Sequence, residues 1–400
     1  MSFLIIGAAC VLAIYMAWNI GANDVANSMS TAVGTKAITL RQALLIAAIL
    51  NVVGAVFVGS HVVETLRKGI VNPQPIASYK IMYGALSSLL AAGLWITFAT
   101  WRGLPVSTTH SIVGALTGFG LVAGGTSVIN WGKLGQVVLS WIISPLFAGL
   151  LAFCVFQLIR FAILNKTNPI RYAQIAAPFI TGITFFIFTL SIFWKTPLGT
   201  RIGNASLSFI IAFSVAVIAA VGGYLVMHRI ARWQHDVEEF FRRLQILTSC
   251  YVAFSHGAND VANAISPFAT VVTIAQTGTI GAKTHVPLYF LAIGGIGIAI
   301  GIITWGWRVI QTVAFKITRL TNSRAFCIDF SAASAVLLAS KLGMPVSTTH
   351  AAVGAVIGIG LARGIEAIDL RVIRDIAVSW GITLPISAGL SAIFFKLFIH

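Results

Sequence analysis

Long apolar runs and short polar connections alternate along the whole chain. The longer runs hold about 20 residues, enough for a helix to cross a hydrocarbon layer of roughly 30 Å. The pattern therefore predicts an all-α polytopic membrane protein with about twelve transmembrane segments. The fourth and eleventh runs are short, glycine-rich and polar at their start, which favours half-helices or re-entrant hairpins there. The candidate spans are residues 3–20, 41–60, 79–101, 107–124, 134–160, 173–194, 206–228, 244–259, 286–306, 325–341, 347–362 and 372–398.

Composition agrees with this class and sets an orientation. The chain is 58% hydrophobic and 9% charged, with a net charge of +16. Lys and Arg lie singly or in short groups between apolar runs, so we expect no nucleic-acid partner. If the twelve runs all cross, 17 of the 26 Lys and Arg fall on one side. The positive-inside rule places that side in the cytoplasm, with both termini outside and the connection 229–245 inside.

Three motifs occur twice, in the same order. GANDVAN stands at 21–27 and 257–263, and PVSTTHSIVGALTGFG at 105–120 matches PVSTTHAAVGAVIGIG at 345–360 in 11 of 16 positions. A third pair, SWIISPLFAGL and SWGITLPISAGL, ends the repeat. We therefore divide the chain into a first repeat (1–160), two linking spans with a short cytoplasmic loop (161–243) and a second repeat (244–400). Seven spans separate the repeat starts, so the repeats are inverted, as in secondary transporters that work by alternating access.

The GANDVAN motif favours a cation site. Asn23, Asp24 and Asn27 share one helix face. Because glycine and asparagine are poor in helix interiors, we expect the helix to break here and to free backbone carbonyls. Carboxylate, amide and carbonyl oxygens together suit a hard cation such as Na⁺. The second copy supplies Asn259, Asp260 and Asn263. The alternative is that these side chains only hydrogen-bond between helices, but carboxylates inside a membrane are costly and usually functional.

The PVSTTH motif favours an anion site. Pro105 ends one helix, and Ser107, Thr108 or Thr109 can cap the next. A helix N-terminus presents unpaired N–H groups and a positive dipole end, and hydroxyls add donors. Pro345 with Ser347, Thr348 and Thr349 repeats the arrangement. Ordinary helix capping is the alternative.

Three further titratable residues lie in apolar runs. His110 and His350 close the two PVSTTH motifs, and we favour a structural role, in which each ring bonds a neighbouring carbonyl, over proton transfer. Asp329 is a third acid within a span. It either binds another cation or pairs with a Lys or Arg.

At these motifs the chain resembles the PiT family of inorganic phosphate transporters, in its prokaryotic form. GANDVANSMSTAVGTKAIT at 21–39 and GANDVANAISPFATV at 257–271 are similar to the family's two signatures. The resemblance implies inverted repeats, outward termini and phosphate uptake driven by Na⁺ or, in some bacterial members, by H⁺ with metal phosphate. It implies phosphate and cation contacts at Asn23, Asp24, Ser107, Thr108, Thr109, Asn259, Asp260, Ser347, Thr348 and Thr349.

Two departures from the resemblance concern ion stoichiometry. Many members have Glu where this chain has Asp329, and many eukaryotic members have Glu at the position of Asn51. Neither departure touches the signature motifs.

The sequence thus predicts a Na⁺-coupled phosphate symporter of the cell inner (plasma) membrane. Na⁺ is the coupling ion, and no other cofactor is expected. The alternatives are proton-coupled phosphate or metal-phosphate symport, a sulfate permease, a channel, and an intramembrane hydrolase with Ser107 or Ser347 as nucleophile. Duplication of every candidate residue argues against an enzyme. The partners are inorganic phosphate, Na⁺ and the lipid bilayer. The oligomeric state is open, and a homodimer is one assembly that we consider.

Overall fold

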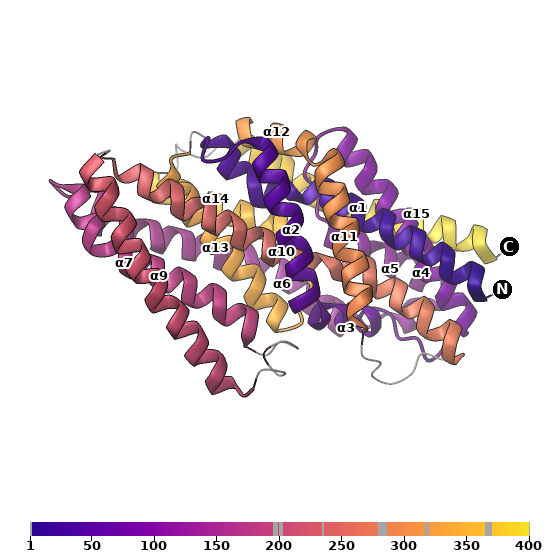
Figure 1. Ribbon diagram of the computed structural model, residues 1–400. Helices are drawn as coiled ribbons and strands as arrows, with labels where there is room; N and C mark the ends of the chain where they lie inside the picture. Colours follow the sequence, from indigo (N-terminus) through magenta and orange to yellow (C-terminus); the bar gives the residue numbers. More distant parts are fainter. Residues whose placement is uncertain are drawn as a thin grey trace.

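The computed structural model describes residues 2–194, 199, 203–233, 236–278, 286–316, 320–364 and 370–399, and these parts are helical apart from short connections (Figure 1). The α-helices are α1 (Ser2–Gly34), α2 (Leu40–Val58), α3 (Ser60–Gly69), α4 (Ser78–Trp101), α5 (Thr108–Gly124), α6 (Trp131–Ile159), α7 (Pro169–Phe193), α9 (Ala205–Trp233), α10 (Val237–Thr277), α11 (Leu288–Trp305), α12 (Trp307–Lys316), α13 (Asn322–Lys341), α14 (Thr348–Arg363) and α15 (Leu370–Ile399). A 3₁₀ turn follows α5 at Thr126–Val128, and a π-helix extends α6 at Arg160–Leu164.

Nine helical segments among the described residues are long and apolar enough to cross a membrane. Large apolar side chains on their outer faces are exposed, for example Phe213 at 65% and Ile218 at 72% on α9. Such surfaces suit lipid rather than water, so the chain is an all-helical, multi-pass membrane protein. The twelve predicted spans all fall on helices, but whether each helix crosses stays a prediction.

The predicted helix break at GANDVAN is wrong. Helix α1 runs unbroken from Ser2 to Gly34, and α10 runs unbroken from Val237 to Thr277. Asparagine disfavours helices when its side chain competes for nearby backbone groups. Here the amides of Asn23 and Asn259 instead donate to neighbouring helices and connections, so the competition does not arise. The first and eighth predicted spans are correspondingly too short.

The predicted loop 229–245 is also mostly helical. Helix α9 continues to Trp233 and α10 begins at Val237, with Asp236 capping it through a bond from the Glu238 amide. Residues 234–235 lie outside the described residues. Charged residues near the ends of these two helices made the segment look like a connection, although charge alone does not end a helix.

Helices from the two ends of the chain interleave. Helix α1 packs against α11, and α10 packs against α2; likewise α5 packs against α15, and α14 against α6. Glycines allow these close approaches, since a Cβ on Gly21 would lie 1.9 Å from the Ile298 carbonyl oxygen and one on Gly257 2.1 Å from that of Asn51. Helices α7 and α9 pack together on one side, and both termini lie on the other (Figure 1).

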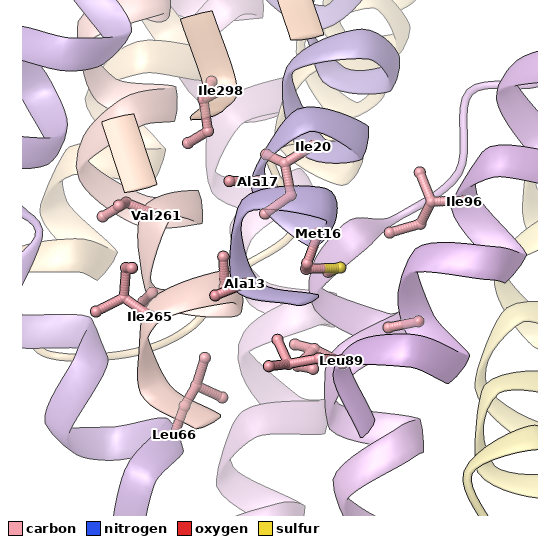
Figure 2. Close-up of a cluster of buried hydrophobic side chains, with 14 of the residues drawn as sticks. Ala13, Met16, Ala17, Ile20, Leu66, Leu89, Ile96, Val261, Ile265 and Ile298 are labelled. Carbon is pink, nitrogen blue, oxygen red and sulfur yellow. The ribbon is translucent and has the colours of Figure 1, made fainter. Parts of the chain in front are cut away.

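The apolar core sits where α1, α3, α4, α10 and α11 meet (Figure 2). Ala13 and Ala17 of α1 lie on the side of Val261 and Ile265 of α10, and Met16 lies on the side of Ile96 of α4, within one buried cluster. Ile20 directly precedes the first GANDVAN copy, so the core reaches the motif itself. The long helices α1 and α10 are thus fixed side by side by apolar packing, and this packing positions their polar residues.

Candidate functional site

Two buried carboxylates from α1 and α10 meet at one histidine. Nε2 of His256 lies 3.6 Å from Oδ2 of Asp24 and 3.1 Å from Oδ2 of Asp260. All three side chains are at most 1% exposed. The acidic residues of the two GANDVAN copies, 236 positions apart in sequence, therefore form a single cluster inside the protein.

Both PVSTTH motifs begin a helix in the way the sequence predicts. Ser107 is the N-cap of α5 and accepts a bond from the His110 amide at 3.2 Å; Ser347 does the same for the His350 amide on α14. Before each motif, a glycine with positive φ (Gly103 at 67°) ends the preceding helix, as left-handed C-caps do. The linkers 104–107 and 344–347 are non-helical.

The threonines after each cap bond to the carboxylates. Thr108 donates to Asp24 at 2.7 Å, and Thr348 donates to Asp260 at 3.2 Å. Thr109 also donates to Asp260, at 3.3 Å, and to the Val346 carbonyl at 3.1 Å. The predicted anion and cation motifs are therefore in direct contact with each other.

The last asparagine of each GANDVAN copy reaches the other half of the chain. Asn27 donates to Thr349 at 2.9 Å, and Asn263 donates to Thr109 at 3.2 Å. Asn263 also donates to Asp260 at 3.1 Å. These bonds join α1 to α14 and α10 to α5 across the cluster.

The first asparagine of each copy holds a linker. Asn23 donates to the Leu104 carbonyl at 3.0 Å and accepts from the Val106 amide at 3.1 Å. Asn259 donates to the Val346 carbonyl at 2.8 Å. Both side chains thus lie beside the carboxylate cluster, and their amides also donate to side chains, Asn23 to Thr100 and Asn259 to Asp260. Carbonyls outside regular helix do lie here, on the linkers, because Pro105 and Pro345 cannot continue a helix. Those of Leu104 and Val346 are not free, since they accept the bonds from Asn23 and Asn259.

Sequence reasoning missed His256, although it lies between the two carboxylates. The sequence prediction rests on residues that occur in both repeats, and the position equivalent to His256 is Ile20. Nδ1 of His256 contacts Oδ1 of Asn51 on α2 at 2.5 Å. The signal that could have found it is the difference itself: a lone histidine beside one copy of a duplicated acidic motif.

The two repeated histidines lie against each other behind the threonines. The rings of His110 and His350 meet edge to face with centroids 4.5 Å apart. Nδ1 of His350 lies 3.1 Å from the Trp141 carbonyl, and the His110 ring packs on the Trp141 indole. The carbonyl contact of His350 is of the kind expected of a structural role. The structural role of the two histidines stays a prediction.

Asp329 on α13 forms a separate buried group. It accepts bonds from Thr31 at 2.9 Å and from Ser249 at 2.6 Å, and it is 1% exposed. Its bonding partners in these contacts are hydroxyls on α1 and α10, the helices that also carry Asp24 and Asp260.

A buried cluster of carboxylates, amides and hydroxyls, placed at two helix N-termini among membrane-spanning helices, is typical of ion-coupled solute transporters. Residues 20–391 match the phosphate transporter family, and the chain belongs to that family. It is a phosphate transporter rather than an enzyme.

Similar proteins occur in archaea and plants. The chain is 50% identical to a candidate phosphate permease of Pyrococcus abyssi, covering 97% of this chain and 96% of the relative. It is 40% identical to the chloroplastic inorganic phosphate transporter 2-1 of Arabidopsis thaliana, covering 98% and 72%. A solved structure described as the sodium-dependent phosphate transporter is 46% identical and superposes with a TM-score of 0.94, covering 99% of each chain.

Proposed function

We propose that the chain carries out Na⁺-coupled symport of inorganic phosphate by alternating access. The observation that carries this proposal is the contact between the two motifs: Asp24 and Asp260 lie within hydrogen-bond distance of the helix-start threonines. Two carboxylates beside a phosphate would repel it strongly in a low-dielectric interior. Cations bound at the carboxylates remove this repulsion and make phosphate binding conditional on them.

The assigned roles follow from the chemistry of the donors. Hydroxyls and helix N-termini bind the anion, and carboxylate and amide oxygens bind the cation. The proposed phosphate contacts are Asn23, Asp24, Ser107, Thr108, Thr109, Asn259, Asp260, Ser347, Thr348 and Thr349. The proposed Na⁺ contacts are Asn23, Asp24, Asn27, Asn259, Asp260 and Asn263. The similarity to a sodium-dependent phosphate transporter supports Na⁺ as the coupling ion.

Two equivalent, inverted halves are a common structural basis of alternating access, and the packing of the helices supports them. The pair α1–α11 corresponds to α10–α2, and α5–α15 corresponds to α14–α6. We therefore retain the division into an inverted repeat at 1–160, linking spans at 161–243 and a second repeat at 244–400. Helices α5, α10 and α14, added to the nine candidate spans, would give the twelve crossings, with both termini outside the plasma membrane. A homodimer stays a prediction.

The test is phosphate binding and uptake with Asp24→Asn and Asp260→Asn. Each variant keeps the side-chain size and removes the charge that holds Na⁺. Coupling between two ligands is typically about 5–150-fold in affinity, and we expect each variant to lose most of it. The measurements are phosphate affinity across a Na⁺ titration at constant ionic strength and Na⁺-driven accumulation in liposomes.

The matched control is Asp236→Asn, an exposed acid at the N-cap of α10, where asparagine caps equally well. It should transport as the wild type does. Unchanged Na⁺ dependence in both site variants would contradict the proposal. Wild-type accumulation driven by a pH gradient, with Na⁺ absent, would favour proton coupling instead.

A further inference from the structure

Beside the carboxylates, one pair of facing residues differs in polarity between the two halves of the site. On α10 and α2 this pair is His256 and Asn51. On α1 and α11 the equivalent positions hold Ile20 and Ile298. Two glycine contacts establish this equivalence: Gly21 packs against the Ile298 carbonyl, and Gly257 packs against the Asn51 carbonyl. Ile20 and Ile298 belong to the apolar core (Figure 2). A polar group beside the carboxylates therefore exists on one side only, and repeat symmetry does not account for it.

The surroundings of His256 leave one ring nitrogen facing the carboxylates. The Asn51 amide nitrogen donates to the Ala47 carbonyl at 2.8 Å, which turns its oxygen toward the ring. Nδ1 of His256 then donates to that oxygen. Nε2 makes no hydrogen bond of regular geometry among the described residues, but it lies within ion-pair distance of Asp24 and Asp260. Three potential ligand atoms thus lie within 4.8 Å of one another, one from the ring and one from each carboxylate. A proton on Nε2 makes the cluster an ion pair, and a ring that releases this proton offers its lone pair to a cation.

The two distances from the histidine nitrogen suit a tetrahedral metal ion. Zinc lies about 2.0–2.2 Å from nitrogen and carboxylate oxygen, which puts neighbouring ligand atoms roughly 3.3 Å apart. The observed distances from Nε2 are 3.1 Å to Asp260 and 3.6 Å to Asp24. Imidazole nitrogen favours zinc and similar transition metals over alkali ions. Donation of the other ring N–H to a fixed oxygen is the usual support of a metal-binding histidine.

We propose that Asp24, His256 and Asp260 form a binding site for a divalent transition metal such as Zn²⁺, and that this metal competes with Na⁺ for the two carboxylates. Two carboxylates neutralise the ion, and three protein ligands leave the fourth position to water. Asn51 is a positioning residue that fixes the ring. The competition with Na⁺ rests on the proposed function, whereas metal binding does not.

The direct test is calorimetric titration of the purified full-length protein with ZnCl₂ in Na⁺-free choline buffer. The wild type should bind one equivalent that His256→Gln loses. His228→Gln on α9, a histidine outside the site, should keep it. X-ray absorption at the zinc edge should show one imidazole per bound zinc. Equal zinc binding by His256→Gln, or a wild-type spectrum without imidazole, would overturn the proposal.

Two further measurements test the support of the histidine ring by Asn51 and the competition between zinc and Na⁺. Asn51→Leu should weaken zinc binding by about 10–100-fold, the usual effect of losing such a supporting contact. Replacing choline by Na⁺ at constant ionic strength should weaken zinc binding to the wild type; unaltered zinc affinity would refute the competition. Na⁺-driven uptake measured with EDTA present tests the proposed function separately, because no zinc is then available.

Discussion

At the residue scale, Thr108 and Thr348 occupy equivalent places and bond equivalent carboxylates. If each hydroxyl turns its proton from the carboxylate to phosphate during transport, Thr108→Val and Thr348→Val remove that donor and keep the side-chain shape. A hydrogen bond to a charged group contributes about 1.5–3 kcal/mol, so phosphate affinity should fall roughly 10–150-fold. Phosphate binding to purified protein at saturating Na⁺ measures this loss.

The control for these variants is Thr117→Val in the same helix. Thr117 is buried on α5 and donates to the Val113 carbonyl, one turn back. Its loss should leave phosphate affinity unaltered. Wild-type affinity in both Thr108→Val and Thr348→Val would remove the hydroxyls from the anion site and leave them as supports for the carboxylates.

What could be predicted at this scale depended on repetition. Asp24, Asp260 and the threonine pairs could be predicted because polar side chains are costly inside apolar segments, so their presence in both repeats indicates a function. His256 was missed for the same reason, since it occurs once. The commitment of Asn23 and Asn259 to linker backbone could not be predicted either, because it depends on where Leu104, Val106 and Val346 lie in space.

At the element scale, glycines set how closely the short helices approach their partners. A Cβ on Gly118 of α5 would lie 2.1 Å from the Ala388 carbonyl oxygen of α15, and one on Gly358 of α14 2.0 Å from the Gly149 oxygen of α6. Gly118→Ala and Gly358→Ala force these helices apart. We expect each to lower the free energy of unfolding by about 1–3 kcal/mol, the usual cost of overpacking. Thermal unfolding in detergent measures it.

Gly135→Ala on α6 is the matched control, because nothing lies within 4 Å of a Cβ there. Alanine favours helix over glycine by about 1 kcal/mol, so this variant should be neutral or slightly stabilised. If Gly118→Ala and Gly358→Ala behave like the control, the close approach of the helices is not needed for stability.

The sequence predicted the short helices better than the long ones. Proline and the serine caps fix where α5 and α14 begin by local chemistry, and the predicted starts at 107 and 347 differ from the observed ones by one residue. The lengths of α1 and α10 were underestimated, because hydropathy falls at the polar motif while the helix continues. Tertiary bonds to the asparagines keep the helix intact, and such bonds are not visible in a local pattern.

At the scale of the whole molecule, the two halves interleave. Each GANDVAN helix packs against the second helix of the other half, and each asparagine at the motif's end bonds a threonine of the other half. The site is therefore assembled from both halves at once. A change in how one half tilts against the other would alter contacts on both sides of the carboxylate pair, which is the coupling that alternating access needs.

The proposed inverted arrangement makes a topological prediction at equivalent loops. Thr126 follows α5 and Arg363 ends α14, and both residues are exposed. If the repeats are inverted with both termini outside, the loop after α5 faces outward and the loop after α14 faces the cytoplasm. Thr126→Cys and Arg363→Cys, each made after replacing the four native cysteines by alanine, should therefore react with a membrane-impermeant maleimide from opposite sides.

In intact cells Thr126→Cys should be labelled at once and Arg363→Cys only after permeabilisation. Phe3→Cys, close to the N-terminus and 92% exposed, provides the reference for the outside. Labelling of both loop positions from the same side would mean that the halves enter the membrane in the same direction. The two carboxylates would then lack the in-plane axis that lets one site open to either side, and alternating access would need a different structural basis.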